Sequence, residues 1–412
     1  MNKYLYILSL AGVAFLSACS NSDDLSIVEY PAVNKTKESA LIYEAGQNSE
    51  VPITLGTSHS RGYTRAPIGG ESGNPAYESF DTESDKYLGV FCLATGYQSS
   101  YHPIENNWTD EDNADLIVRL RNVPAKVVRR EVTPGSGVYT SDVTFLDSTT
   151  LASPTPTEMK FYYPISNWMK YNFYAYYPRQ AYDVAGTKTH SFGESQVLEK
   201  YFEIDGSQDI IWGMANPPAV DAAFSAKYFK DNVSAEKPQL KFEHKLVQFR
   251  FFVIATDDAL AKEMKIANMY ISNAVYRLSL IVANKTNEAD TKNGQLNLLG
   301  DFKTDTLYIK ENGTNDNRFN GTPPFDININ NTSVDVSSDT PVGYIMLARP
   351  DVAYEKKADY KYKLVVRVQY KDGTKTKYKN VPRFMTPPEG GFQEGKIYNI
   401  VVKVGLSGGI PN

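Results

Sequence analysis

The sequence predicts an all-β protein of two domains, and three observations favour this fold class. The chain is rich in residues that suit strands, with 29 Tyr and 19 Phe against 3 Trp. Short segments of alternating apolar and polar residues are separated by turn residues along the chain. A helical pattern is confined to one short segment, 256–262. The length of 412 residues, 42% of them hydrophobic, suits two compact domains.

Charge and composition exclude several classes of function. Lys and Arg number 43 and Asp and Glu 48, which gives a net charge of -5 without long blocks of one sign. We therefore expect no nucleic-acid partner. The 4 His and 2 Cys are not spaced as in a zinc site, a Cys/His nucleophile or a haem attachment. We therefore expect neither a metal ion nor a cofactor.

The first 18 residues are typical of an export signal. Lys3 supplies a positive charge, and residues 4–16 form an apolar stretch that is too short to span a bilayer. The segment closes with Leu-Ser-Ala-Cys at 16–19, which resembles the lipobox of bacterial lipoproteins, where the Cys thiol receives a diacylglycerol. An ordinary signal peptide that contains a Cys is the alternative. The resemblance implies that Cys19 is lipidated and anchors the mature chain to a membrane.

Residues 19–45 are predicted to form a flexible tether between the lipid and the folded part, because they are polar and poor in aromatic residues. Within them, Ser-Asn-Ser-Asp-Asp at 20–24 resembles the surface-export signal of Bacteroidetes lipoproteins. This implies a lipoprotein exposed on the cell outer membrane. After lipidation only Cys92 keeps a thiol, and we expect it to be buried in a strand.

The first strand is expected at 50–56. Val51, Ile53 and Leu55 alternate with polar residues and share one face, as in a half-buried strand. Pro52 cannot donate a backbone hydrogen bond, which predicts that this strand lies at the edge of a sheet. Residues 57–77 follow as an exposed loop, rich in Gly, Ser and Arg, that carries Arg61 and Arg65.

Further strands are predicted in the first half at 87–95, 125–132, 138–145, 160–164 and 171–178. In the last of these, apolar and aromatic residues occupy both faces of the pleat, so we expect both faces to be covered. A Pro-rich break at 216–218 and a polar stretch up to Lys237 predict a linker near residue 235. The predicted domains are 46–234 and 235–412.

The second half opens with an apolar pattern at 240–253 whose phase changes after Leu246, which predicts a bulge. A hairpin is predicted at 362–384, with Asp372 and Gly373 in a type I′ turn. Other strands are expected at 268–282, 295–299, 307–310, 344–348 and 396–404.

No group of residues predicts catalysis. Gly-Leu-Ser-Gly-Gly at 405–409 fits a hydrolase nucleophile motif, yet no His follows it. The acidic segment 110–115 lacks the Gly and the final Glu of an EF-hand loop. His244 has no spaced partner for a metal, and we expect a hydrogen-bonded structural role. We predict a protein that is not an enzyme. Three Trp residues are candidate sugar platforms, although isolated Trp residues lie more often in cores: Trp108, Trp168 and Trp212.

Several segments together resemble the fimbrillin family of Bacteroidales, the Mfa-like subunits of major and minor fimbriae. The matching pieces are the lipobox at Cys19, Ile-Thr-Leu-Gly at 53–56 with the Arg-bearing loop after it, and the segments 173–178, 209–215, 240–246 and 395–398. They span nearly the whole chain. The resemblance implies two transthyretin-like (Ig-like) β-sandwich domains in tandem, in agreement with the strand pattern.

The resemblance also implies assembly by strand exchange. A protease would cut after Arg61 or Arg65, and the strand with Val51, Ile53 and Leu55 would leave and be replaced by a strand of another fimbrillin subunit. The tail after Val404 is short and rich in Gly, so it makes a poor donor strand. The expected function is therefore a structural or tip subunit of fimbriae that supports adhesion to a host or bacterial target. The alternative is a surface glycan-binding lipoprotein, and a lipid-anchored hydrolase is a more remote third.

Overall fold

The computed structural model describes the greater part of the two predicted domains, and strands dominate it. Within the described residues, helix is limited to α3 (Ala226–Asp231) and the 3-10 turn η4 (Ser148–Thr150). The all-β fold class is therefore confirmed. The described residues are 48–59, 86–96, 120, 122–131, 133–134, 139–164, 170–180, 197–215, 224–257, 264–284, 293–298, 304–311, 327–329, 331–349 and 361–405.

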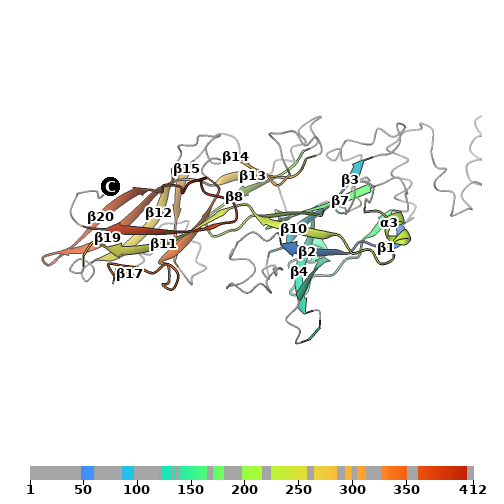
Figure 1. The fold of residues 1–412 in the computed structure, drawn as a ribbon, viewed down its shortest axis with the longest axis horizontal. Coiled ribbons are helices and arrows are strands. Elements are labelled where there is room, and N and C mark those ends of the chain that lie inside the picture. Colours follow the sequence, from blue (N-terminus) through green and yellow to red (C-terminus); the bar gives the residue numbers. More distant parts are fainter. Residues whose placement is uncertain are drawn as a thin grey trace, which may run out of the picture.

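The molecule is elongated (Figure 1). A barrel built mainly from the first half of the chain lies at one end, and a pair of sheets from the second half lies at the other. A three-stranded sheet lies between them. Long strands of the second half, such as β11 (Val247–Ala255), β19 (Lys363–Asp372) and β20 (Lys375–Phe384), run roughly along the axis of the molecule, whereas β4 (Val123–Glu131) of the barrel runs across it.

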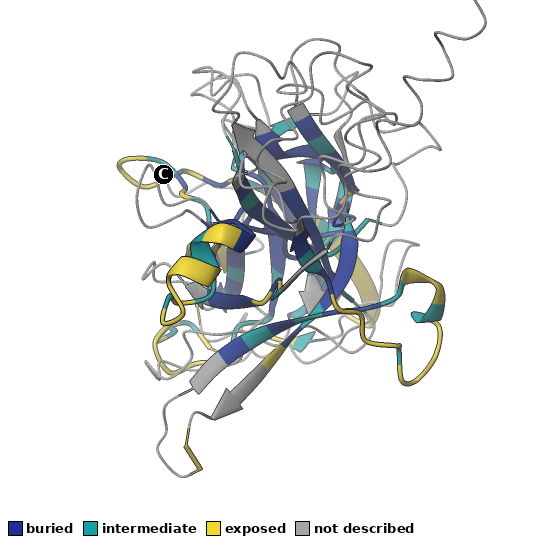
Figure 2. Cartoon of the chain, turned by 90° about the vertical axis from the view of Figure 1, so that its right-hand side faces the viewer, coloured by how far each residue is buried: buried dark blue, intermediate teal, exposed yellow. Residues whose placement is uncertain are grey.

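Seven strands close into a barrel, where the sequence predicted a sandwich for the first half. Each strand is hydrogen-bonded to a neighbour on both sides, so this sheet has no free edge. Figure 2 shows buried positions along the barrel strands, while α3 turns exposed residues outward. In order around the barrel the strands are β10 (Gln239–His244), β2 (Leu55–His59), β5 (Tyr139–Phe145), β4 (Val123–Glu131), β3 (Leu88–Gly96), β7 (Lys170–Tyr177) and β9 (Ile211–Ala215).

A separate two-stranded sheet pairs β1 (Asn48–Pro52) with β6 (Tyr162–Pro164) in antiparallel fashion. Tyr163 of β6 packs with Phe229 of α3, their ring centroids 5.4 Å apart. The sequence pattern missed α3. Its one local signal is Ser225, whose side chain caps the helix by accepting a hydrogen bond from the backbone N–H of Tyr228.

The second half forms two sheets that enclose a common apolar core. One sheet contains β16 (Lys310–Glu311), β18 (Gly343–Leu347), β11 (Val247–Ala255) and β21 (Ile397–Val404). The other contains β15 (Thr304–Tyr308), β12 (Lys265–Val275), β19 (Lys363–Asp372) and β20 (Lys375–Phe384), with β17 (Ile327–Asn328) paired to β12.

Strand pairing crosses the boundary predicted at residue 235. In the sheet between the two ends, β8 (Val197–Glu203) pairs with β13 (Arg277–Asn284), which also pairs with β14 (Leu296–Leu298). In the barrel, β10 from beyond the boundary pairs with β2 and β9. The exact division into domains stays a prediction.

The phase change after Leu246 marks a change of sheet, which corrects the prediction of a bulge. β10 ends at His244 in the barrel, and β11 begins at Val247 in the second half. Phe242 and His244 are buried before the change, and Phe249 is buried after it. The inward-facing phase shifts because the strand leaves one core and enters another.

Both faces of β7 are covered, as the sequence predicted. Tyr171, Phe173, Ala175 and Tyr177 belong to the barrel core. Tyr174 and Tyr176 belong to the core that continues into the second half. The two ends of the molecule therefore share apolar packing through the barrel wall.

The predicted hairpin at 362–384 is present as β19 and β20, but its turn differs. Asp372 pairs with Lys375, so Gly373 and Thr374 form the two-residue loop. Gly373 has φ +60° and Thr374 does not have a positive φ. A type II′ turn has this pattern, whereas a type I′ turn needs positive φ at both positions.

Candidate functional site

The strand predicted at 50–56 is two strands, and only the first lies at a sheet edge. β1 ends at Pro52, and β2 begins at Leu55. β2 has β10 on one side and β5 on the other, so the prediction that Leu55 lies on an edge strand is wrong. Pro52, which has no backbone N–H to donate, is the last residue of β1, so this missing hydrogen bond does not affect β2.

β2 is held on both sides by backbone hydrogen bonds. It pairs in parallel with β10 over 56–59 and antiparallel with β5 over 55–57. The backbone N–H of Ile53 donates to the carbonyl of Phe161 at 2.8 Å, and that of Gly56 to the carbonyl of Pro238 at 2.9 Å. The segment thus fills a slot between two strands of the barrel.

The side chains predicted to fill a groove do lie in the barrel core. Ile53 is 4% exposed and Leu55 is 1% exposed, and both pack in the core shared by β5 and β10. Val51 is partly buried against the same core. The period-two pattern therefore placed these three residues on the correct face.

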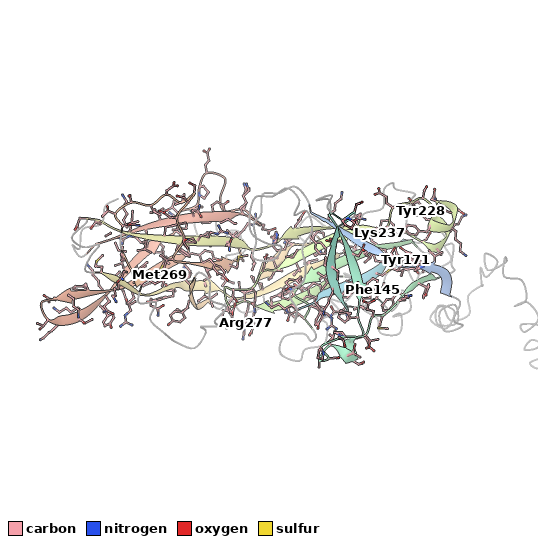
Figure 3. The ribbon with its side chains drawn as sticks, turned by 90° about the horizontal axis from the view of Figure 1, so that it is seen from below. Phe145, Tyr171, Tyr228, Lys237, Met269 and Arg277 are labelled. Atoms are coloured by element: carbon pink, nitrogen blue, oxygen red, sulfur yellow. The ribbon has the colours of Figure 1, made fainter. Side chains whose placement is uncertain are left out.

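An ion pair crosses β2 on the outer side of the barrel (Figure 3 labels Lys237). Gly56 lies in register between Gln239 of β10 and Asp142 of β5. Lys237, just before β10, forms an ion pair with Asp142. A Cβ at Gly56 would lie 2.5 Å from the Gln239 side chain, so Gly leaves the room that these polar side chains occupy. Both ends of the ion pair are about one third exposed, and its contribution to stability is about 1 kcal/mol or less.

Two hydroxyls weaken the inner side of the same slot. Thr57 of β2 lies opposite Ser141 of β5, and both side chains are buried. Neither hydroxyl oxygen has a hydrogen-bond partner in the described part of the protein. A buried hydroxyl without a partner costs about 1–3 kcal/mol, so β2 is held less tightly than its apolar contacts imply.

The other predicted residues of this site fall outside the described residues. These are Cys19, the predicted lipidation residue, and the two predicted cleavage residues, Arg61 and Arg65. In the sequence, Arg61 follows the last residue of β2, His59, by two positions. The acidic segment 110–115, Ser407, Trp108 and Trp168 also lie outside the described residues.

Trp212 is not available as a sugar platform. It is 7% exposed, and its Nε1–H donates a hydrogen bond to the backbone carbonyl of Val282 at 2.8 Å. It joins β9 of the barrel to β13 of the middle sheet.

His244 has the structural role predicted for it. Its Nδ1 lies 2.5 Å from Oδ2 of Asp209, and both side chains are buried. The next residue, Lys245, forms an ion pair at 2.6 Å with Glu394. These contacts stabilise the point at which the chain passes from the barrel to the second half.

The described residues contain no group of three or more His, Cys, Asp and Glu side chains arranged to hold a metal ion. No helix in the described ranges is both long and apolar enough to cross a bilayer.

Several solved structures are similar to this chain over most of its length. Crystal structures of a "putative cell adhesion protein" from Bacteroides uniformis, Bacteroides eggerthii and Bacteroides fragilis cover 86%, 87% and 88% of this chain. The matches cover 93%, 87% and 95% of those proteins, with TM-scores of 0.41, 0.41 and 0.39. Sequence identities are 10%, 9% and 10%. The sequence matches no family model and no curated protein.

Proposed function

We propose that the protein is a structural or tip subunit of cell-surface fimbriae that assembles by proteolysis-triggered strand exchange and supports adhesion. The observation that supports this proposal is the position of β2. It is an N-terminal strand inserted between β5 and β10, and it ends two residues before Arg61. A cut after Arg61 or Arg65 frees the C-terminal end of this strand.

Removal of β2 leaves an open slot with a strand on each side. An incoming strand can form backbone hydrogen bonds to β5 and to β10 at once, which is more pairing than a sheet edge offers. Burial of each of Ile53 and Leu55 stabilises the fold by about 1.5–3 kcal/mol, so emptying the slot lowers the free energy of unfolding by about 3–6 kcal/mol. A whole domain is stable by only about 5–15 kcal/mol. The barrel with an empty slot is therefore much less stable, and a strand from another fimbrillin subunit recovers the lost stability.

The exchange also requires that β2 can leave. The unpartnered hydroxyls of Thr57, in the middle of β2, and of Ser141, opposite it on β5, cost about 1–3 kcal/mol each. Pairing with β5 ends at Thr57, so the last two residues of β2 pair with β10 alone. Release then begins at the cut end, where β2 is held least tightly.

A double Arg61→Ala, Arg65→Ala variant tests the cleavage step. The purified mature protein is incubated with an Arg-specific protease, and assembly is followed by SDS gel electrophoresis without boiling. We expect ladders for the wild type and monomer for the double variant, while each single variant is cut at the remaining Arg. Ladders of equal intensity for the double variant would refute exchange through this segment.

We also propose that the mature chain is attached to the outer membrane through lipid on Cys19. The only other Cys, Cys92, is buried in β3 and does not accept acyl chains in the folded protein. A Cys19→Ala variant is expected to lose acyl labelling and to leave the membrane fraction. Acyl labelling retained by this variant would rule out the anchor.

A further inference from the structure

The hairpin formed by β19 and β20 carries a concentration of positive charge that the rest of the chain does not have. Residues 363–384 contain seven Lys and Arg against one acidic residue, Asp372, although the whole chain has a net charge of -5. Asp372 forms an ion pair with Lys377, and this hydrogen bond raises the pKa of the Lys377 ammonium. The hairpin reaches the end of the molecule remote from the barrel (Figure 1).

Strand register divides these side chains between two faces. Val366 of β19 and Val381 of β20 face one another and are buried in the core. Residues one position away face outward, which places Lys363, Arg367 and Lys371 on the outer face of β19. None of the three forms an ion pair within the described residues. We call this the outer face of the hairpin.

Aromatic rings lie beside these cations on the same face. Tyr378 is 52% exposed and Phe384 is 65% exposed, both on β20. The Arg367 guanidinium lies 4.8 Å from the centre of the Tyr378 ring, a cation–π contact between the two strands of the hairpin. Tyr270 of β12 and Tyr308 of β15 extend the row of rings, with centroids 5.6 Å apart.

The edge of β20 does not suit strand addition. β20 is the last strand of its sheet, which leaves one side without a partner among the described strands. Lys375, Lys377 and Lys379 make this edge a poor template for strand pairing, and Pro382 lacks a backbone donor. A partner is therefore bound by side chains on the outer face and not by backbone pairing along the edge.

We propose that the outer face of the hairpin binds an acidic polysaccharide. Its carboxylates pair with Lys363, Arg367 and Lys371, which recur every four residues along β19, and its sugar rings stack on Tyr378 and Phe384. Phe384 is a single exposed apolar side chain, which is too little to enter a lipid bilayer. This binding requires no strand exchange, so it is independent of the proposed assembly.

The test measures binding of uncut, monomeric mature protein to polygalacturonate by titration calorimetry. We expect saturable binding that weakens as salt rises. An Arg367→Gln, Lys371→Gln variant should bind about tenfold more weakly. A matched variant, Lys227→Gln, Lys241→Gln, removes two exposed charges from α3 and β10 and should bind like the wild type.

A second series separates the rings from the charges. Tyr378→Ala should weaken binding about fivefold without changing its salt dependence, and Tyr378→Phe should restore it. Neutral dextran and the acidic polymer polyglutamate serve as competing probes, and both should bind at least tenfold more weakly. If dextran binds as tightly as polygalacturonate, the cations do not contribute to recognition. If polyglutamate binds as tightly as polygalacturonate, the aromatic rings do not contribute. Either result, or no binding of polygalacturonate, would overturn the proposal.

Discussion

At the scale of single residues, Cys92 is a fully buried titratable group of the barrel. It lies in β3, faces the barrel core and is 0% exposed. Burial raises the pKa of its thiol well above the ordinary value, because the thiolate would lose its hydration. The same cause raises the pKa of Tyr163, which lies in the same core. The core thus tolerates these groups only in their neutral forms.

This burial predicts a loss of stability at alkaline pH. The folded-state pKa of Cys92 exceeds the unfolded value of about 8.5. The contribution of the protonated thiol to the free energy of unfolding is therefore complete below about pH 8.5, and it declines as pH rises toward the folded-state pKa. Between pH 7.5 and 9.5 the free energy of unfolding should fall by about 1.4 kcal/mol more in the wild type than in Cys92→Ala, as measured by urea titration. Equal losses in both proteins would contradict the assignment.

At the scale of elements, β2 is one of the strands that close the barrel, and it pairs on both sides. Leu55 fills the core between β5 and β10, whereas its neighbour Thr54 is exposed. Leu55→Ala should lower the free energy of unfolding by about 2–5 kcal/mol. Thr54→Ala should change it by less than about 0.5 kcal/mol. Urea unfolding of the two variants checks this, and a loss below 1 kcal/mol for Leu55→Ala would show that β2 adds little to the barrel.

Strand positions were largely predictable from the sequence because alternation records which face is buried. It located Ile53, Leu55 and both faces of β7 correctly. It did not indicate which strands are neighbours, so β2 was expected at an edge and the change of sheet after His244 was expected to be a bulge. Parallel pairing with β10, whose Gln239 lies 183 residues after its partner Gly56, leaves no local signal in the sequence.

The candidate site was predictable only in part. Cys19, Arg61 and Arg65 came from linear motifs, and their roles stay predictions. The Lys237–Asp142 ion pair across β2 joins residues 95 positions apart, and no sequence pattern predicts it. The positive charge of the β19–β20 hairpin can be counted in the sequence. The nearly equal numbers of acidic and basic residues in the whole chain do not indicate it, because composition averages over position.

At the scale of the whole molecule, the two ends are not independent. The chain passes from β10 to β11 and from β12 to β13 with only one or two residues between the strands. In both cases it leaves one sheet and enters another. The apolar core of the second half extends to the barrel strands β7 and β9, where it includes Tyr174, Tyr176 and Trp212.

This continuity predicts a single cooperative unfolding transition for the mature chain, with coincident far-UV circular dichroism and tryptophan fluorescence. A fragment of residues 46–234 lacks β10, which lies between β2 and β9, so we expect it to show no cooperative transition. A sigmoidal transition of this fragment on its own would show that the barrel forms without β10.

The passage of strands between sheets also determines how the molecule responds to mechanical tension. Strands such as β11, β19 and β20 run along the axis of the molecule (Figure 1), so a pull on its two ends loads the hydrogen bonds between them and their neighbours in shear. Bonds loaded in shear must break together, whereas bonds loaded across a hairpin break one after another. If such subunits assemble into a surface appendage, each would resist the drag of flowing liquid through these hydrogen bonds.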